Sequence, residues 1–368
     1  MKKRLAAAFL AAAMAVTSLT ACGGSETETT AAAAAATEAA AEAEEGAETE
    51  AAGEESAAAT EGETYTLRYA ELNPDGHIMD ECGDYFAQLV NEKSGGRITI
   101  EVFPAGQLGD EKTMYQTIQM GGGAIDICRA NTNSLVDFGA QKLTLFGLPF
   151  IFRDREHLWN VLNSEIGDEF KNELQELGTG MVGLFYLDEG SRNFFTKEGV
   201  EIRTAEDLKG LKLRVPTTDL MSDTVAALGA QSTPISFSEL YSALQTGTVD
   251  GAEQPHSGYY SNKYAEVAPN YSLTGHTYSP SIVIMAESVW NKLSDADKAI
   301  IEEAAKETEQ WNRENIEKLD AELLEQIKAE GANVIEIEDK SSFIEATKDV
   351  VAKYAAGYED YYEQILAK

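Results

Sequence analysis

The amino-acid sequence predicts an α/β fold built as two lobes, each around a largely parallel sheet. Three observations predict it. Strand-like and helix-like segments alternate from Thr66 onward, as they do in βαβ units. The same alternation restarts after Asp188-Glu189-Gly190. Residues 65–368 are also more than a single hydrophobic core usually organises.

Apolar periodicity, glycine stops and polar caps define the elements expected in the first lobe. In chain order we expect a strand at 66–70, a helix at 77–93, a strand at 98–102, a helix at 110–120, a strand at 124–129, helices at 154–163 and 165–177, and a strand at 181–187. Because this is βαβ repetition, groups that recognise a ligand are expected at the carboxyl ends of the strands.

The second lobe follows the same logic with shorter elements. We expect a strand at 193–196, a capped turn at 204–208, a strand at 211–215, a helix at 220–228, a strand at 233–235, and a helix from the capping box Ser236-x-x-Glu239 to Gly247. The segment Val249-Asp250-Gly251-Ala252 then leads into a loop. The apolar segment 279–286 predicts a strand that returns to the first lobe.

The C-terminal part begins with a long helix. Ser294 caps a helical pattern that reaches about Glu330 without proline or glycine, which is longer than most helices of globular proteins. A strand at 334–337 and a helix at 342–367 follow.

The N-terminal segment has the composition of an export signal and a stalk. Its basic start precedes an apolar run shorter than the ~20 residues that span a bilayer, and Leu19-Thr20-Ala21-Cys22 has the small residues of a lipoprotein processing box. We expect 1–22 to be this signal, with Cys22 acylated as a membrane anchor. Residues 23–64 are almost all Ala, Glu, Thr, Gly and Ser, which predicts a disordered stalk or a partly helical spacer.

The formal net charge of −34 argues against nucleic acid as a partner, because nucleic acids are bound by basic faces. It does not exclude a small anion, since salt screens charges beyond ~8 Å and a local arginine dominates inside a cleft. Beyond Cys22 the cysteines are Cys82 and Cys128, whose spacing matches no metal site. Two separately buried thiols are expected, and a disulfide between them stays open.

The sequence offers no motif of catalysis. Gly121-Gly122-Gly123 follows a helix and precedes a strand, the reverse of a phosphate-cradling loop. The histidines lack the spacing of a helical metal pair, and no Gly-x-Ser-x-Gly elbow occurs. We therefore expect no enzyme activity, no metal and no cofactor.

Arg214 is the most informative residue, because it lies in the apolar strand 211–215 that Pro216 closes. A guanidinium inside a domain needs a counter-charge, since burying it unpaired costs several kcal/mol and it cannot lose its proton. Arg192 begins a strand of the same lobe, so both arginines could converge on one planar anion. From residue types alone, surface ion pairs explain both equally well.

Three segments are similar to the solute-binding proteins of TRAP transporters, the DctP-like family that captures organic acids outside the cell. They are DLKGLKLRVP at 207–216, FSELYSALQTGTVDGAEQP at 237–255 and GGRITIEVFPAGQLGDE at 95–111, and the similarity extends from Tyr65 to the C-terminus. The resemblance implies a periplasmic-binding-protein-like fold with a hinge, an interlobe cleft and a long spine helix. It also implies that the final strand and helix pack on the second lobe. With this family arrangement, we expect the first lobe to comprise 65–189 plus 280–319, and the second lobe 190–279 plus 320–368.

The resemblance implies a set of binding residues in the second lobe. Arg214 matches the family arginine that grips a carboxylate through two parallel hydrogen bonds, and Arg192 matches a second carboxylate-facing arginine. Gln254 stands where the family usually has an asparagine on the ligand carboxylate, so its longer amide reaches differently. Phe237 matches an aromatic residue that packs against the bound acid, although a core position at the start of a helix explains it as well.

Side chains of the first lobe are candidates for contacts with the distal end of the ligand. Asn73 and His77 lie in a strand-to-helix turn, where turn chemistry also explains Asn73, and Asn131 follows a strand. Arg129 is a further cation at a strand's carboxyl end, which favours a second carboxylate or a polyhydroxylated acid. An ion pair with a nearby aspartate, such as Asp126 or Asp137, is the alternative.

These observations together predict a lipid-anchored extracytoplasmic receptor. It would bind an organic acid, such as a uronate or an aldonate, and deliver it to the membrane subunits of a TRAP transporter. The alternatives are a receptor for C4-dicarboxylates or other carboxylates, an ABC-type or sensor-linked binding lipoprotein, and an exported sugar-acid enzyme.

Overall fold

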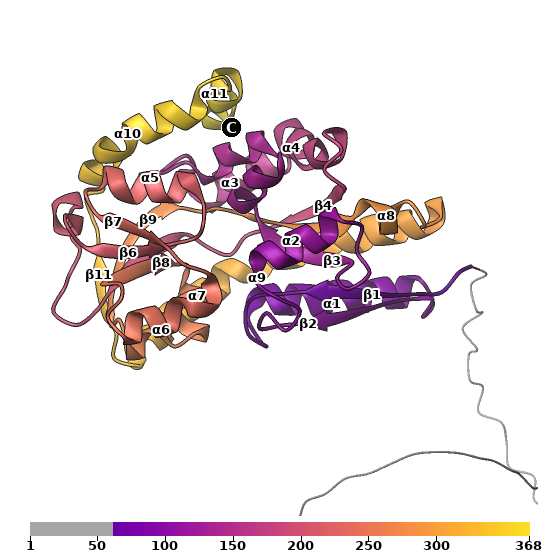
Figure 1. The fold of residues 1–368 in the computed structure, drawn as a ribbon, viewed down its shortest axis with the longest axis horizontal. Coiled ribbons are helices and arrows are strands. Elements are labelled where there is room, and N and C mark those ends of the chain that lie inside the picture. Colours follow the sequence, from indigo (N-terminus) through magenta and orange to yellow (C-terminus); the bar gives the residue numbers. More distant parts are fainter. Residues whose placement is uncertain (1–61) are drawn as a thin grey trace, which may run out of the picture. The chain divides into compact units, whose positions relative to one another are not determined.

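Two β-sheets organise the part of the chain that the computed structural model describes, residues 62–368 (Figure 1). The strand order is β2-β1-β3-β10-β4 in the first sheet and β11-β9-β5-β8-β6-β7 in the second. We call the parts built around these sheets the first and second lobes. The presence of two lobes with α/β architecture confirms the fold class that the sequence predicts. The expected signal peptide with Cys22, and the expected stalk up to residue 61, lie outside the described residues.

The first sheet is mixed rather than largely parallel. Its strands are β1 (Tyr65–Ala70), β2 (Ile98–Phe103), β3 (Ile127–Asn131), β4 (Met181–Leu187) and β10 (Ser281–Ala286). β1 pairs in parallel with β2 and β3, whereas β10 is antiparallel to β3 and β4. Every residue of β10 is buried, as expected for a central strand that is covered on both faces. β3 begins later than predicted, because the Asp126 carboxylate first binds the backbone N–H groups of Arg68 and Gly123.

Short-range caps fix where the helices of the first lobe begin. These helices are α1 (Ile78–Lys93), α2 (Glu111–Gln119), α3 (Arg155–Leu162), α4 (Glu165–Glu176) and the short α8 (Glu287–Trp290). The first four are capped by side chains that accept a hydrogen bond from a backbone N–H of the first turn, namely His77, Asp110, Asp154 and Ser164. Because each cap is local in sequence, the predicted starts are correct to within a residue or two.

The second sheet contains two strands that sequence reasoning missed. Its strands are β5 (Arg192–Thr196), β6 (Lys212–Val215), β7 (Gln231–Pro234), β8 (Gly251–Gln254), β9 (Asn270–Thr277) and β11 (Asn333–Glu336). The segment of β8 was expected to be a loop, and β9 was not predicted. Both are rich in glycine and polar residues, which have low strand propensity. All four residues of β8 are nevertheless buried, and Glu253 forms an ion pair there.

The helices of the second lobe are α5 (Asp219–Ala227), α6 (Leu240–Gln245) and α7 (His256–Ser261). The helix predicted from Ser236 to Gly247 is instead a 3₁₀ turn at Phe237–Glu239 followed by α6. The Ser236 hydroxyl donates to the Glu239 carboxylate at 2.6 Å, and no cap bond to the backbone forms. The two side chains of the expected capping box therefore bind each other.

Two strand crossings and one helix connect the lobes. One crossing joins β4 to β5, and the other joins β9 back to β10. The two crossings lie side by side, because Arg192 pairs with Thr277 and Leu187 pairs with Ser281. The predicted long helix is α9 (Asp295–Ala329), 35 residues long, and it contacts the cores of both lobes. Its Asn312 amide accepts from the backbone N–H of Asp188 (2.8 Å) and donates to the carbonyl of the same residue (3.2 Å). The crossing backbone is thus held against the spine (Figure 1).

The C-terminal segment forms two helices rather than the single one predicted. α10 (Ser341–Ala355) and α11 (Glu359–Ala367) meet at Gly357, whose φ of +88° favours glycine. α10 contributes Phe343 to the core of the second lobe. α11 lies on the first lobe, where the Tyr361 ring meets the ring of Phe170 edge-on at 5.2 Å. The expectation that the final helical segment packs on the second lobe is therefore wrong for α11.

Cys82 and Cys128 are separate buried thiols, and no disulfide joins them. Burial raises the pKa of both thiols, which suits core residues rather than reactive ones. Between residues 62 and 368 no helix has both the length and the apolar character needed to cross a bilayer.

The docking of α11 can be tested with two adjacent residues. Ile365 is 0% exposed, whereas Leu366 is 40% exposed. Ile365→Ala should lower the free energy of unfolding by about 2–4 kcal/mol, because it leaves a cavity between α11 and the first lobe. Leu366→Ala should change it by less than about 0.5 kcal/mol. Urea denaturation measures both values, and equal effects of the two substitutions would contradict this placement of α11.

Candidate functional site

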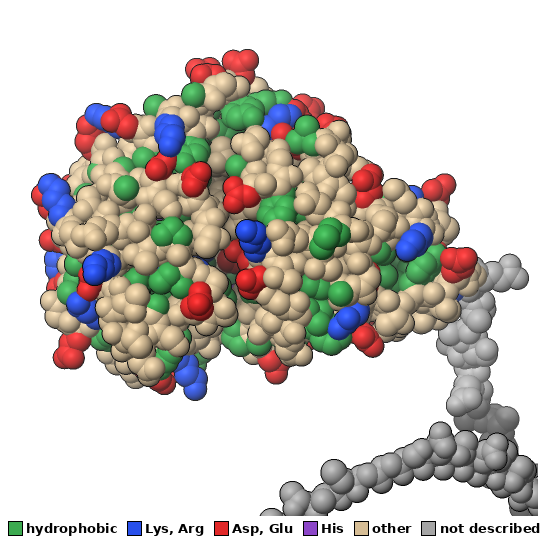
Figure 2. All heavy atoms as spheres, in the orientation of Figure 1, with side chains coloured by type: hydrophobic (Ala, Val, Ile, Leu, Met, Phe, Trp, Pro, Cys, Tyr) green, Lys and Arg blue, Asp and Glu red, His purple; other side chains and the backbone are tan. Residues whose placement is uncertain are grey.

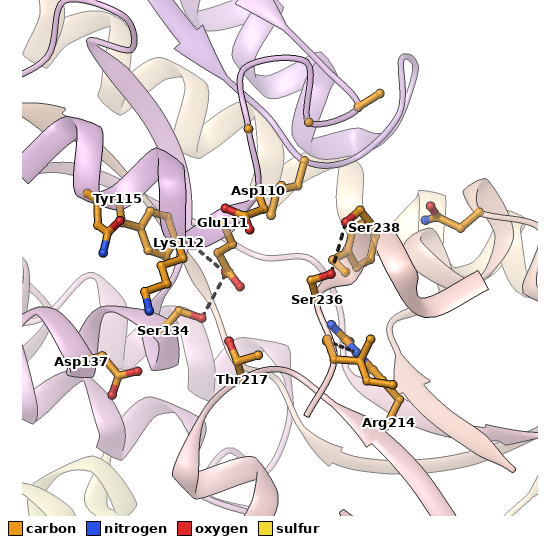
Figure 3. Close-up of a pocket in the computed structure, with 18 of the residues that line it drawn as sticks. Asp110, Glu111, Lys112, Tyr115, Ser134, Asp137, Arg214, Thr217, Ser236 and Ser238 are labelled. Carbon is orange, nitrogen blue, oxygen red and sulfur yellow. Dashed lines mark hydrogen bonds between the residues drawn. The ribbon is translucent and has the colours of Figure 1, made fainter. Parts of the chain in front are cut away.

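A cleft of about 900 Å³ lies between the two lobes, and both lobes line it. Figure 2 shows this face hollowed between the lobes, and Figure 3 shows the side chains that face each other across the cleft. The first lobe contributes one side of α2 along its whole length, together with polar groups that follow β3. The second lobe contributes the ends of β6 and β7 and the 3₁₀ turn after them. The labelled lining residues are Asp110, Glu111, Lys112, Tyr115, Ser134, Asp137, Arg214, Thr217, Ser236 and Ser238.

A smaller cavity of about 50 Å³ forms the floor of this cleft. It shares five lining residues with the larger cavity, namely Leu72, Glu111, Ser134, Arg214 and Phe237. Seven of the eight sequence-predicted contact residues line it: Asn73, Arg129, Asn131, Arg192, Arg214, Phe237 and Gln254. The strand ends of the two sheets therefore bring together residues that are up to 181 positions apart in the sequence.

Arg214 is the buried cation of this site that lacks a counter-charge in the described part of the chain. Its side chain is on β6, and the residue is 3% exposed. Its Nε donates to the carbonyl of Ile235 at 2.8 Å, while Nη1 is buried without a partner. No carboxylate within residues 62–368 pairs with it. Burial lowers the pKa of Arg214, and the more distant Glu253 opposes that shift only in part.

Arg192 is equally buried but is already neutralised by Glu253 on the neighbouring strand β8. Its Nη2 donates to Oε1 of Glu253 at 2.8 Å, and its Nε donates to Oε2 of the same carboxylate. Although burial lowers the pKa of Arg192, Glu253 raises it overall, opposite to the shift at Arg214. Burial alone would raise the pKa of Glu253, but Arg192 and His276 lower it to about 2. Arg192 and Arg214 line the same floor, but between residues 62 and 368 a carboxylate pairs only with Arg192, which keeps Nη1 as a donor without a hydrogen-bond partner in the described part of the chain.

Arg129 is also neutralised, by two carboxylates. Its Nε and Nη2 donate to Glu71, both at 2.8 Å, and its Nη1 donates to Glu189 at 2.5 Å. Arg129 therefore forms ion pairs within the protein, as the alternative interpretation of this residue predicted. The suggested partners were wrong, because Asp126 binds backbone N–H groups instead and Asp137 forms no ion pair with Arg129.

The asparagines of the first lobe hold the local backbone as well as lining the floor. Asn73 donates to the Glu71 carboxylate through both its backbone N–H (2.8 Å) and its side-chain amide (2.9 Å). Asn131 accepts from the backbone N–H of Asn133 and donates to the carbonyl of Ser279. Their polar groups are therefore largely occupied within the protein.

His77 does not line either cavity, so its expected role as a specificity contact is not supported. Its Nδ1 accepts from the backbone N–H of Met79 at 3.1 Å, which makes it the cap of α1. Burial lowers its pKa to about 4, and Nε2 has no partner. The polar turn that suggested a ligand contact is explained by capping.

Gln254 and Phe237 would contact a ligand bound in the small cavity at the floor of the cleft. Gln254 follows Glu253 on β8 and is buried, and no residue in the described part of the chain hydrogen-bonds its side-chain amide. Phe237 is half-buried and lines both cavities. Both line the same small cavity as Arg214, the first with an amide and the second with an aromatic ring.

Sequence reasoning missed the carboxylates of the site. Glu71, Glu189 and Glu253 neutralise the two other arginines, and Glu111 on α2 faces the cleft. Glu71, Glu111 and Glu189 each follow a strand of the first sheet, directly or after a short turn. The rule that functional groups gather at the carboxyl ends of strands would have found these three.

Comparisons with known proteins show which family this chain matches. A family model described as bacterial extracellular solute-binding protein, family 7, matches residues 69–357. The chain is similar to a TRAP periplasmic solute-binding protein from Pseudomonas putida F1, solved with bound D-glucuronate. The two superpose with a TM-score of 0.79 at 32% identity, covering 83% of this chain and 97% of that one.

Two characterised relatives have different ligands in their names. The sialic acid-binding periplasmic protein SiaP of Vibrio cholerae is 33% identical over 283 residues, which is 75% of this chain and 84% of the relative. The C4-dicarboxylate-binding protein DctB of Bacillus subtilis is 33% identical over 272 residues, which is 74% of this chain and 75% of the relative. Both names specify a carboxylic acid.

Two histidines with lowered pKa values predict how stability depends on pH. Burial lowers the pKa of His77 and His256 from 6.5 to about 4. Between pH 6.5 and about pH 4 the unfolded chain therefore binds protons that the folded chain does not, so the free energy of unfolding falls as the pH is lowered through this range. His77→Asn keeps a cap for α1 and removes one of these groups, so its unfolding free energy should fall less steeply. Urea denaturation between pH 7 and pH 5 tests this, and identical slopes for both proteins would contradict it.

Proposed function

Because this chain belongs to family 7 of the bacterial extracellular solute-binding proteins, the receptors of TRAP transporters, we propose that it captures a sugar acid of the uronate or aldonate class. The ligand carboxylate binds Arg214 on the floor of the cleft, and the two lobes then close around the ligand. The single observation that carries this proposal is the buried guanidinium of Arg214 without a counter-charge.

The geometry of Arg214 determines how the acid approaches it. Nε is occupied by the Ile235 carbonyl, so the edge formed by Nη1 and Nη2 is the one left for a ligand. A planar carboxylate fits this edge through two parallel charge-assisted hydrogen bonds, which are among the strongest available in a desolvated site. Gln254 donates to the same carboxylate, and Phe237 covers one face of the ligand.

The polar walls of the cleft favour a hydroxylated acid. Hydroxyl groups come from both lobes, among them Ser134, Thr217, Ser236 and Ser238. The volume of about 900 Å³ leaves room for a six-carbon acid while the lobes are apart. A solved relative with bound D-glucuronate and a relative that binds sialic acid support the same class. The positive charge of Arg129 is weaker support for a hydroxylated acid than the sequence suggested, because Glu71 and Glu189 already neutralise that charge.

Closure follows from the way the lobes are joined. The paired crossings at 187–192 and 277–281 and the spine α9 are the connections about which the lobes rotate. A ligand that touches both walls binds the closed state more tightly than the open one and so shifts the equilibrium toward closure. Binding and release suffice for this role, and catalysis plays no part in it. The closed receptor then delivers its acid to the membrane subunits of the transporter, with Cys22 as its lipid anchor.

A receptor for C4-dicarboxylates is the second candidate, because one relative of similar identity has that ligand. A thermal-shift screen that includes uronates, aldonates and C4-dicarboxylates separates the two. Stabilisation by the dicarboxylates alone would favour the second candidate. NMR spectra of a bound sugar acid over several hours would reveal turnover if the protein were an enzyme.

The role of Arg214 predicts opposite effects on binding and on stability. Arg214→Met should lower the affinity for the cognate acid at least 30-fold, about 2 kcal/mol or more. The free energy of unfolding without ligand should stay the same or rise, because the substitution removes a buried charge that has no partner. Calorimetry and urea denaturation give the two quantities.

Arg203→Met is the matched control, since Arg203 is exposed on the same lobe and pairs with Glu201. It should change neither quantity appreciably. If Arg214→Met kept its affinity within threefold, or lost stability as a buried paired arginine would, Arg214 would be a structural residue instead.

A further inference from the structure

We propose that Glu111 sets the ligand specificity of the cleft. Its carboxylate accepts hydrogen bonds from ligand hydroxyls and repels a second ligand carboxylate. The receptor is therefore restricted to hydroxylated acids that have one carboxylate, and it rejects the corresponding diacids. This inference rests on the proposed function, since it requires that an acid binds at Arg214.

The protein holds the Glu111 carboxylate in one orientation. Glu111 is the first residue of α2, and its Oε1 accepts from the Tyr115 hydroxyl at 2.7 Å and from the Ser134 hydroxyl at 3.0 Å. Tyr115 in turn accepts from the backbone N–H of Asn131 at 3.1 Å. Two donors thus fix one oxygen, and the other oxygen forms no hydrogen bond with any residue between 62 and 368. This chain of bonds presents an acceptor to the cleft.

Glu111 also occupies the right place relative to Arg214. Both line the wide cleft and its floor, one from the first lobe and the other from the second. In Figure 3 the Glu111 carboxylate extends from α2 into the space that separates the two lobes, with Arg214 on the far wall. A ligand whose carboxylate binds Arg214 would therefore direct the rest of its chain toward Glu111.

The charges around Glu111 leave no free guanidinium for a second carboxylate. Arg192 is bound by Glu253, and Arg129 by Glu71 and Glu189. Glu111 itself forms no ion pair within the described part of the chain. A carboxylate at the distal end of a ligand would face this carboxylate at short range in a partly desolvated cleft, which is unfavourable. A hydroxyl there donates to it, and bonds to a charged acceptor are stronger than neutral ones.

Lys112 is the group that could reverse this preference. It follows Glu111 on α2, lines the wide cleft and is exposed. In the view of Figure 3 it extends toward Ser134 and Asp137, on the side of Glu111 away from Arg214. An exposed ammonium beside an aspartate is screened by water and by that neighbour. Glu111 is therefore the charge that a ligand held by Arg214 meets first.

Three six-carbon sugar acids of the same configuration, which differ in the oxidation state of their end carbons, test this inference. D-Gluconate and D-glucuronate have one carboxylate, whereas D-glucarate has a carboxylate at both ends. Calorimetry on the wild-type chain should give an affinity for the better monoacid at least about tenfold higher than for D-glucarate. Glu111→Gln should lower the monoacid affinity about tenfold and leave that for D-glucarate unchanged or higher, so that the preference disappears. Glu111→Asp keeps the charge and should keep the rejection of the diacid.

Asp110→Asn is the matched control. Asp110 lines the same cleft, and its removal changes the charge by the same amount. Its Oδ1 caps α2 by accepting from the backbone N–H of Thr113 at 2.9 Å, a role that asparagine fills equally well. The control should keep the wild-type preference. Thermal unfolding of each variant checks that the fold is retained.

The possible results distinguish a failure of this inference from a failure of the proposed function. If Glu111→Gln keeps the ratio of monoacid to diacid affinity within twofold, or if Asp110→Asn abolishes it equally, the inference is wrong while the proposed function stands. A wild-type preference for D-glucarate also overturns it and assigns the second carboxylate to Lys112. If no sugar acid binds or stabilises the wild-type chain at all, the proposed function itself fails.

Discussion

A buried guanidinium without an internal counter-charge is the constraint on which the structure of this cleft depends. Arg214 on β6 is buried and is held by one carbonyl, and it lines the floor of the cleft. Leaving a charge in that state weakens the folded protein. In the proposed function, an acid that binds Arg214 supplies the missing counter-charge and removes this cost.

The two neighbouring arginines differ from Arg214 because the chain itself supplies their counter-charges. Arg192 has its own bidentate carboxylate, and Arg129 is shared between two glutamates. The three guanidiniums lie around one small cavity and are similarly buried, yet they differ in whether a partner is supplied by the chain. We propose that this difference, rather than charge or burial, distinguishes the arginine that receives the ligand carboxylate from the two that the chain already neutralises. The carboxylates also make the floor selective, because they leave one cation free rather than three.

Local signals predicted much of the fold and one key residue. The strand β4, the helix α9 with its Ser294 cap, and the buried position of Arg214 all follow from short stretches of sequence. The strands β8 and β9 could not be predicted, because their polar residues are stabilised by partners on other strands rather than by apolar alternation. The same holds for the ion pairs of Arg129 and Arg192, whose carboxylate partners lie about sixty positions away. The return of α11 to the first lobe likewise depends on the break at Gly357 and on a surface built elsewhere in the chain.

The central claim is that Arg214 receives the acid group of the ligand. A crystal structure of the protein with D-glucuronate tests it most directly. The account predicts closed lobes, with the ligand carboxylate within hydrogen-bonding distance of Nη1 and Nη2 of Arg214, and with Glu253 still bound to Arg192. A carboxylate bound elsewhere, with Nη1 of Arg214 still unpaired beside an occupied cleft, would contradict it.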